Sequence, residues 1–97
     1  MGKIPDHILE EIRSKISISE VVSQYVHLTP KGGRLWGLCP FHDEKTPSFT
    51  VNEEKGFYHC FGCGKGGRIF NFVMDIEHLS FVEAVKLLAE KSGVVIA

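Results

Sequence analysis

Two pairs of potential metal ligands, each separated by two residues, constrain this chain more than any other sequence feature. The first pair is Cys39 and His42, and the second is Cys60 and Cys63. Structural zinc sites hold the ion in a tetrahedron of four thiolate or imidazole ligands, and a two-residue spacer lets one tight turn direct both of its ends at one ion. The spacing therefore predicts a single structural Zn²⁺ ion bound by all four side chains.

Other roles for these four residues fit the sequence less well. Three unrelated buried cysteines and a surface histidine would show the required spacing in both pairs only by coincidence. A catalytic zinc site usually keeps three protein ligands and leaves the fourth position to water, whereas four candidates are present here. His59 could replace His42, but adjacent side chains on a strand point to opposite faces, so His59 should face away from an ion bound by Cys60.

The motif of zinc deaminases is the main catalytic alternative. These enzymes combine His-x-Glu with Cys-x-x-Cys, and this chain has His42 and Glu44 ahead of its second cysteine pair. However, the residue before Cys60 is His59 rather than proline, and Cys39 would be left without a role. The deaminase motifs also lie on helices, whereas these segments are typical of strands and turns. We therefore interpret the zinc as structural.

The whole chain, residues 1–97, is expected to form a single zinc-binding domain of the α+β class. We divide it into a helical zone over residues 1–29, a zinc-binding zone with a small antiparallel β-sheet over 30–67, and a second helical zone over 68–97. The apolar tail at residues 94–97 is compatible with an edge strand, and equally with a chain that continues. We expect this domain to be part of a longer protein.

Capping residues predict where helices begin and end. Ser17 with Glu20, and Ser80 with Glu83, form capping boxes, in which serine and glutamate satisfy the first free amides of a helix. Gly93 is suited to end the last helix, because glycine adopts the left-handed conformation without strain. Apolar residues recur every three or four positions within these segments, which predicts helix faces that pack against a core.

Two glycine-containing turns predict β-hairpins in the middle zone. Gly32-Gly33 suits a tight turn in which both central residues have positive φ. Residues 53–56, which end in glycine, form the second candidate turn. The sequence thus predicts four short antiparallel strands, over residues 26–31, 34–39, 48–52 and 57–60.

Composition excludes several classes of protein. A hydrophobic content of 43% and a charged content of 24% are ordinary for a folded domain, and the net charge of −1 implies no bulk attraction to nucleic acid. No apolar run approaches the roughly 20 residues that span a bilayer, and the first ten residues lack the apolar core of a signal peptide. We therefore expect a cytoplasmic protein with no membrane partner, whose cysteines serve metal chemistry rather than disulfides.

The middle zone also suggests a nucleic-acid surface. Arg34 and Trp36 should share one strand face, where an indole beside a cation suits stacking with an unpaired base. Lysines near the predicted knuckles and turns could hold backbone phosphates. The alternative for aromatic residues such as Phe49 and Phe57 is simple core packing. Single-stranded nucleic acid is the predicted partner, with candidate contacts at Arg34, Trp36, Lys45, Lys55, Lys65 and Arg68.

Two runs of sequence closely resemble the N-terminal zinc-binding domain of bacterial DNA primases of the DnaG type. They are Cys39-Pro-Phe-His-Asp-Glu-Lys-Thr-Pro-Ser-Phe-Thr-Val51 and Phe57-Tyr-His-Cys-Phe-Gly-Cys-Gly64. The helical N-terminal segment and the helix that starts at Phe81 also match, so the resemblance covers almost the whole chain. It implies that residues 30–67 form a zinc ribbon and that the domain is the N-terminal part of a longer primase. It also implies one zinc ion, with Cys39, His42, Cys60 and Cys63 as its ligands.

The resemblance also implies a function. In that family the zinc-binding domain recognises the initiation site on a single-stranded template, and a separate polymerase domain with acidic metal-binding residues makes the RNA primer. These 97 residues contain no such acidic site, so the domain itself is expected to be non-catalytic within a parent nucleotidyltransferase. The implied partners are the template, the polymerase domain of the same or another primase molecule, and the replicative helicase through the rest of the primase.

One alternative from another class stays open at this point. A zinc ribbon with a net charge near zero and aromatic strands could dock onto replication proteins without touching DNA. Titration of the chain with short single-stranded DNA at several salt concentrations separates the two functions, because only phosphate contacts give a salt-dependent affinity.

Overall fold

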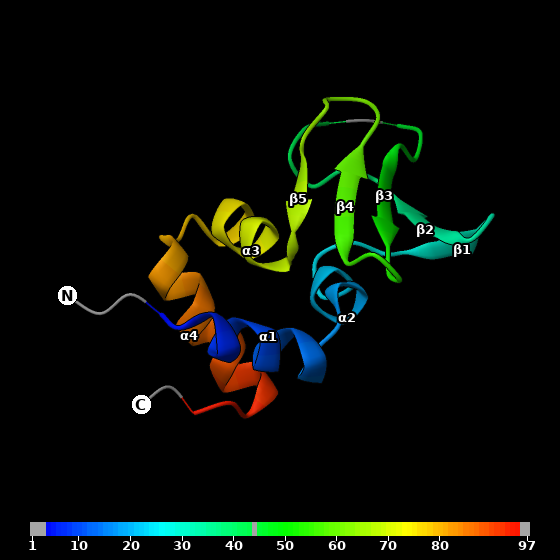
Figure 1. Cartoon of the computed structure of the whole chain (residues 1–97). Helices are drawn as coiled ribbons and strands as arrows, with labels where there is room; N and C mark the ends of the chain where they lie inside the picture. Colours follow the sequence, from blue (N-terminus) through cyan, green and yellow to red (C-terminus); the bar gives the residue numbers. More distant parts are fainter. Residues whose placement is uncertain (1–3, 44, 96–97) are drawn as a thin grey trace.

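The computed structural model of the chain describes residues 4–43 and 45–95. It is elongated, with extents of 43 × 25 × 18 Å, and α1 and α4 lie together at the end opposite the β1–β2 hairpin (Figure 1). In the described residues, no helix has the length and apolar character that a membrane span requires. The elements follow in the order α1 (Asp6–Lys15), α2 (Ile18–Val22), β1 (Thr29–Lys31), β2 (Arg34–Gly37), β3 (Phe49–Asn52), β4 (Phe57–Cys60), β5 (Gly66–Arg68), α3 (Ile69–Glu77) and α4 (Phe81–Ser92).

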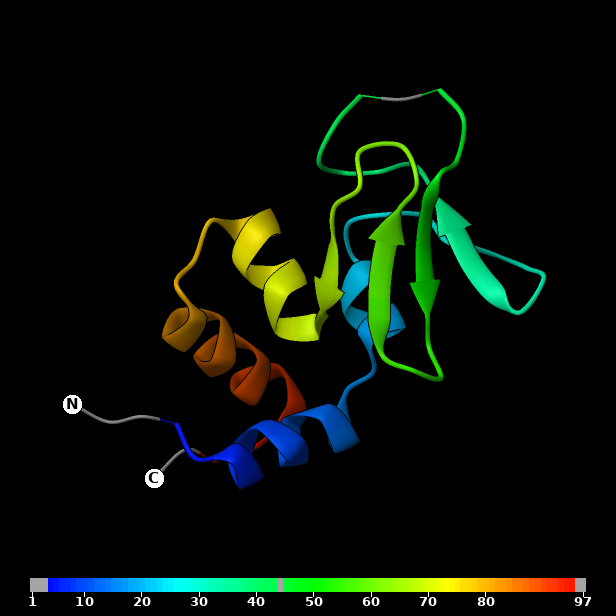
Figure 2. The ribbon, with the colours of Figure 1, turned by 45° about the horizontal axis from the view of Figure 1, so that its top comes forward.

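The sheet is an antiparallel meander in which each strand pairs with the next along the chain, in the order β1-β2-β3-β4-β5 (Figure 2). This confirms the predicted α+β class with a small antiparallel sheet flanked by helices. The turn between β1 and β2 has φ values of 59° at Gly32 and 80° at Gly33, as expected for a primed hairpin turn. The turn before β4 likewise ends at Gly56, with a φ of 72°.

The predicted number of strands was wrong, because the sheet formed by residues 4–43 and 45–95 has five strands rather than four. The extra strand, β5, pairs Tyr58 with Gly67 and His59 with Gly66. Its residues Gly66 and Gly67 carry no side chains, so they give no alternation of apolar and polar positions for a sequence pattern to detect. The first strand is also shorter than predicted, since residues 26–28 precede β1 and cross close to Gly37.

Helix boundaries follow the capping residues. Both predicted capping boxes are present, at Ser17 with Glu20 and at Ser80 with Glu83. Gly93 ends α4 in the left-handed conformation, with a φ of 80°. Val94 and Val95 form no strand, and residues 96–97 of the tail lie outside the described residues.

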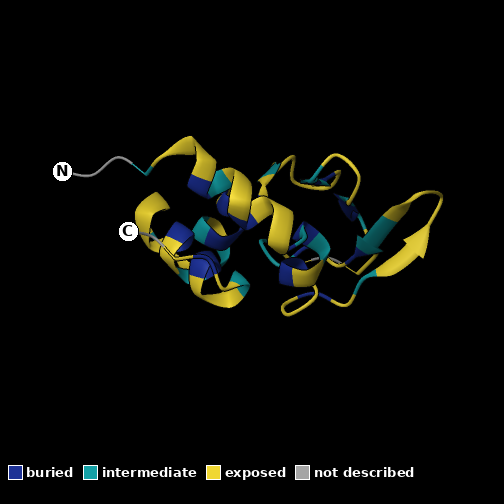
Figure 3. Cartoon of the chain, turned by 60° about the horizontal axis from the view of Figure 1, so that its bottom comes forward, coloured by how far each residue is buried: buried dark blue, intermediate teal, exposed yellow. Residues whose placement is uncertain are grey.

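The core extends from one face of the sheet to the space between the helices α1, α3 and α4. Phe49, Val51 and Tyr58 are completely or almost completely buried on that face, and Phe72 of α3 packs against Phe49 and Tyr58. Core packing was therefore the correct interpretation of Phe49. Figure 3 shows buried residues where the helices pack on one another and where they meet the sheet, while the β1–β2 hairpin projects as a largely exposed arm.

Candidate metal centre

The sheet topology brings the two ligand pairs together. β2 and β4 are both antiparallel to β3, so they run in the same direction and their C-terminal ends lie at the same end of the sheet. Cys39 follows β2 after one intervening residue, and Cys60 is the last residue of β4. His42 and Cys63 lie in the loops that continue from these two strand ends. The described residues therefore place all four predicted ligands in one cluster.

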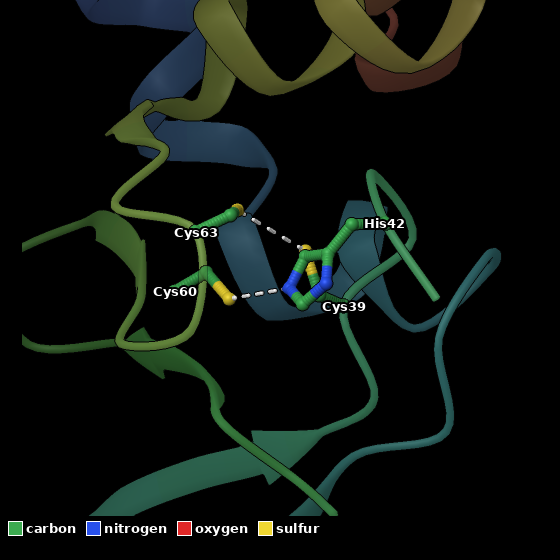
Figure 4. A group of neighbouring side chains, drawn as sticks. All are labelled: Cys39, His42, Cys60 and Cys63. Atoms are coloured by element: carbon green, nitrogen blue, oxygen red, sulfur yellow. Dashed lines mark hydrogen bonds between the residues drawn. The ribbon is translucent and has the colours of Figure 1, made fainter. Parts of the chain in front are cut away.

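The spacing of the four ligand atoms fits a tetrahedral zinc shell. Zinc bonds of about 2.3 Å to sulfur and about 2.0–2.1 Å to nitrogen give tetrahedral edges of about 3.8 Å between sulfurs and about 3.6 Å between sulfur and nitrogen. In the structure, Cys39 Sγ lies 3.9 Å from Cys63 Sγ, and His42 Nε2 lies 3.4 Å from Cys60 Sγ (Figure 4). All four ligand atoms lie within 4.8 Å of one another. A Cys/His cluster of this geometry supports zinc as the bound metal.

The environment of Cys39 disfavours a thiolate unless a cation is present. Burial raises the pKa of the Cys39 thiol, and the neighbouring thiols of Cys60 and Cys63 raise it further. The amide of Phe41, which donates to Cys39 Sγ at 3.4 Å, offsets only part of this effect. Three adjacent thiols cannot all ionise against their mutual repulsion, so a divalent cation is the natural compensation for this cluster.

The environment of Cys60, unlike that of Cys39, favours the thiolate. Burial by itself raises its pKa, but hydrogen bonds from Ser48, from the Cys63 and Gly62 amides and from His42 outweigh burial and lower the pKa. Ser48 Oγ lies 3.5 Å from the Cys60 sulfur. Hydrogen bonds that stabilise the charged form also orient the sulfur toward the centre of the cluster.

The imidazole of His42 is oriented by a backbone group. Its Nδ1 atom lies 3.1 Å from the carbonyl oxygen of Asp43. In the zinc-bound form, a proton on Nδ1 donated to this carbonyl would leave the lone pair of Nε2 directed at the metal, in place of the hydrogen bond from Nε2 to Cys60.

The two knuckles are fixed to the rest of the fold by different means. Phe41, between the two ligands of the first knuckle, packs among the core rings, with centroid distances of 5.7 Å to Phe72 and 6.1 Å to Tyr58. In the second knuckle, the Gly64 amide donates to the Cys60 carbonyl at 2.8 Å, and Gly64 has a φ of 79°. Core packing holds the first knuckle, and a glycine-dependent turn holds the second.

The alternatives raised by the sequence can be compared with this geometry. His59 faces away from the cluster and packs edge-on against Phe61, with a centroid distance of 4.7 Å. Cys39 contributes a fourth ligand atom, and His42 and Cys60 lie in a loop and a strand rather than on helices, so the deaminase arrangement does not apply. Glu44, the proton shuttle of that alternative, lies outside the described residues.

The sheet face opposite the core carries an aromatic and basic cluster that we call the open-face cluster: Arg34, Trp36, His59 and Phe61. Trp36 and Phe61 stack with centroids 6.1 Å apart and planes 25° apart. The Arg34 guanidinium lies 5.9 Å from the Phe61 centroid. Phe61 is 57% exposed although it is a large apolar residue. Phe61 was not among the functional residues predicted from the sequence. The signal that pointed to it is its position between Cys60 and Cys63, because these two ligands must face the metal.

The remaining candidate DNA contacts lie apart from this cluster. Lys65 pairs with Asp75 of α3 at 3.7 Å and lies over the Phe41 ring at 5.4 Å, so its charge is already engaged. Arg68 donates to the backbone carbonyl of Lys55 at 3.3 Å, which places these two residues together near the β3–β4 turn. Lys45 is exposed in the loop that follows the first knuckle.

Comparison with known proteins gives a consistent result. The sequence profile of the CHC2 zinc finger family matches residues 4–97. The DNA primase of Mycolicibacterium smegmatis is 57% identical over 93 residues, and that of Geobacillus stearothermophilus is 54% identical over 92 residues. Each match covers 95% of this chain but 15% of the relative, so the chain spans only a small part of the primases that it matches.

A solved structure has the same fold. The crystal structure of the Aquifex aeolicus primase, containing its zinc-binding and RNA polymerase domains, superposes with a TM-score of 0.86 at 39% sequence identity. The match covers 93% of this chain and 22% of that one.

Proposed function

The chain belongs to the CHC2 zinc finger family and is the zinc-binding domain of a DNA primase; from this we propose that it reads single-stranded template DNA on the open-face cluster. One structural Zn²⁺ ion, held by Cys39, His42, Cys60 and Cys63, would fix the two loops beside this cluster. The observation that carries the proposal is the exposed ring of Phe61, stacked on Trp36 with the Arg34 guanidinium over it.

An exposed aromatic stack is suited to an unpaired base. Stacking of a base on an aromatic side chain contributes about 1–3 kcal/mol and works with any base, because every base has a π face. The Trp36 ring is held in place by its indole N–H, which donates to the Lys31 carbonyl at 3.1 Å. A ring that is already ordered loses little conformational freedom when a base stacks on it or on its partner Phe61.

The zinc ion supports this function indirectly. Phe61 lies between the ligands Cys60 and Cys63, so the conformation of that turn sets the position of its ring. Metal binding in small domains is coupled to folding, so loss of the ion would free both knuckles. We propose no catalytic step for the ion, because all four tetrahedral positions are supplied by the protein.

In the whole protein, this domain would present the template to a polymerase domain that synthesises short RNA primers. The Aquifex aeolicus primase structure contains an RNA polymerase domain as well as a zinc-binding domain. The polymerase domain of the same or another molecule, and the replicative helicase through the rest of the primase, are the partners that we propose. The domain would be the template reader of an enzyme, and the N-terminal part of that longer chain.

The test is titration of the zinc-loaded chain with short single-stranded DNA at several salt concentrations. Binding is monitored through the fluorescence emission of Trp36, the only tryptophan. We expect quenching and a salt-dependent affinity. Phe61→Ala should weaken binding by about tenfold or more, at the lower end of the range for one stacked base. Phe81→Ala, a matched control on α4 where the ring is 40% exposed, should bind normally.

A flat titration would contradict DNA binding. It would favour the alternative that the zinc ribbon docks onto replication proteins without touching DNA.

A further inference from the structure

A pocket of about 630 Å³ adjoins the open-face cluster at the base of the β1–β2 hairpin. This volume lies within the range of about 300–1,000 Å³ that is usual for small-molecule sites. The lining is mostly apolar and comes from three parts of the chain: the segment before β1, the hairpin itself and the loop that contains the first knuckle. The lining residues used below are Tyr25, His27, Thr29, Lys31, Trp36 and Leu38.

We propose that this pocket takes one nucleotide of the template strand, unstacked from its neighbours, with its base among the apolar walls and its phosphate near Lys31. The proposal rests on the proposed function and deepens it. Trp36 belongs both to the open-face cluster and to the pocket lining, so a strand that crosses Phe61 and Trp36 reaches the pocket without leaving the protein surface.

The aromatic walls are ordered before any ligand binds. The Tyr25 hydroxyl donates to the Glu77 carboxylate, and its ring packs edge-on against Phe72 with a centroid distance of 5.8 Å. The Trp36 indole N–H donates to the Lys31 carbonyl. Both rings are thus held by contacts within the protein, and this preorganisation reduces the entropy lost on binding.

The polar groups of the pocket suit a nucleotide rather than a purely apolar ligand. Lys31 is exposed on β1 and forms no salt bridge within residues 4–43 and 45–95, so its ammonium group is available to a phosphate. Thr29 and His27 add polar side chains that can hydrogen-bond a base or a sugar. No acidic residue lines the pocket among the residues that the structure describes.

Two substitutions test the base contact and the phosphate contact separately, using the zinc-loaded chain and fluorescein-labelled oligothymidylate. Leu38→Gln removes an apolar wall without adding charge, and should weaken binding about fivefold with an unchanged salt slope. Lys31→Gln should make the slope of log affinity against log salt shallower by about 0.7, the value for one phosphate on a single strand.

Matched controls are available on α4, away from the pocket. Val82, 42% exposed, is comparable with Leu38, 49% exposed, and Lys86 is an exposed lysine like Lys31. Val82→Gln and Lys86→Gln should leave both affinity and salt slope unchanged. Zinc content is measured for every variant. Leu38 is next to the ligand Cys39, so Leu38→Gln could fail to bind zinc; in that case Lys31→Gln alone still tests the pocket.

The outcomes distinguish this proposal from the proposed function. Normal affinity and salt slope in both pocket variants, with weakened binding by Phe61→Ala, would overturn the pocket and leave the open-face cluster in place. No binding of oligothymidylate by the unsubstituted chain would overturn both. A third arm titrates the chain with free GTP and with thymidine triphosphate. One result would overturn the template strand as the source of the nucleotide: these triphosphates quench Trp36 emission in the unsubstituted chain but not in Leu38→Gln, while Leu38→Gln binds oligothymidylate normally.

Discussion

The guanidinium carbon of Arg34 lies 5.9 Å from the centroid of the Phe61 ring, although the two residues come from different parts of the sheet. Arg34 begins β2, whereas Phe61 follows β4. The sheet brings them together, so a permanent positive charge is held beside an exposed aromatic ring. This pair combines the two interactions that single-stranded nucleic acids use most, stacking and phosphate contact.

Replacing Arg34 with alanine should weaken binding of single-stranded DNA and reduce its salt dependence. Loss of one phosphate contact lowers the slope of log affinity against log salt by about 0.7. Fluorescence titration at several salt concentrations measures the slope. Arg13→Ala on α1 is the matched control, since the Arg13 guanidinium likewise lies over an aromatic ring, that of Phe70 on α3. An unchanged slope would remove Arg34 from the DNA-binding surface.

Replacing Cys60 with serine should abolish zinc binding and, with it, DNA binding. Structural zinc in small domains contributes about 10–16 kcal/mol of apparent binding free energy at neutral pH, so both knuckles should lose their fixed conformation. Elemental analysis of the purified, reduced chain measures zinc content, and titration measures DNA affinity. His59→Ala, one residue away on the opposite face, should keep its zinc. A metal-free Cys60→Ser chain that still binds DNA would contradict the structural role.

Replacing Gly37 with alanine should destabilise the fold. A methyl group there would lie 2.6 Å from Val26 Cγ1 and 2.7 Å from the His27 carbonyl oxygen, and the backbone atom cannot move aside easily. Overpacking of this kind typically costs about 1–3 kcal/mol. Urea unfolding of the zinc-loaded chain measures the change, with Leu38→Ala, at the exposed neighbouring position, as control. Equal stability of Gly37→Ala and the parent chain would show that residues 26–28 approach β2 less closely.

Stability at high pH should depend on Tyr25. Its hydrogen bond to the Glu77 carboxylate, together with burial and the Glu77 charge, raises the pKa of Tyr25 to about 12. Tyrosine in an unfolded chain ionises near pH 10. The folded state therefore holds this proton more tightly, and its contribution to stability is complete below about pH 10 and is lost as the pH rises to about 12.

The Tyr25→Phe variant isolates this contribution. It should be less stable than the parent chain below about pH 10, and the difference should shrink toward about pH 12. Urea unfolding at a series of pH values gives the two stability curves. Parallel curves across this range would show that Tyr25 and Glu77 do not interact in solution. Tyr58, whose pKa is raised by burial and by Asp75, is present in both chains and cancels in the comparison.

Much of this domain was predictable from local signals. Serine and glutamate three positions apart predicted the starts of α2 and α4, because a capping box depends only on neighbouring backbone amides. Gly32-Gly33 predicted the β1–β2 turn for the same reason, since positive φ at two consecutive residues favours glycine. The strand over Phe57–Cys60 was predicted with the bounds that the structure has.

The sequence was less informative about features that depend on contacts between distant segments of the chain. β5 escaped detection because its pairing with β4 depends on the course of the chain around the second knuckle, rather than on its own glycine-rich sequence. The role of Phe61 was not predicted from the sequence for a related reason. A phenylalanine between two cysteines can be buried or exposed, and only the position of Trp36 across the sheet decides which.

The sequence by itself determined the ligand set, the two turns and the helix ends, because each depends on residue types at fixed, short separations along the chain. The tertiary structure decided which aromatic and basic side chains meet. Arg34 and Trp36 both contact Phe61, whereas Lys65 forms a salt bridge with Asp75 of α3. Contacts between residues far apart in the sequence follow from strand direction and register. Direction and register are fixed only when one face of the sheet is buried against the core.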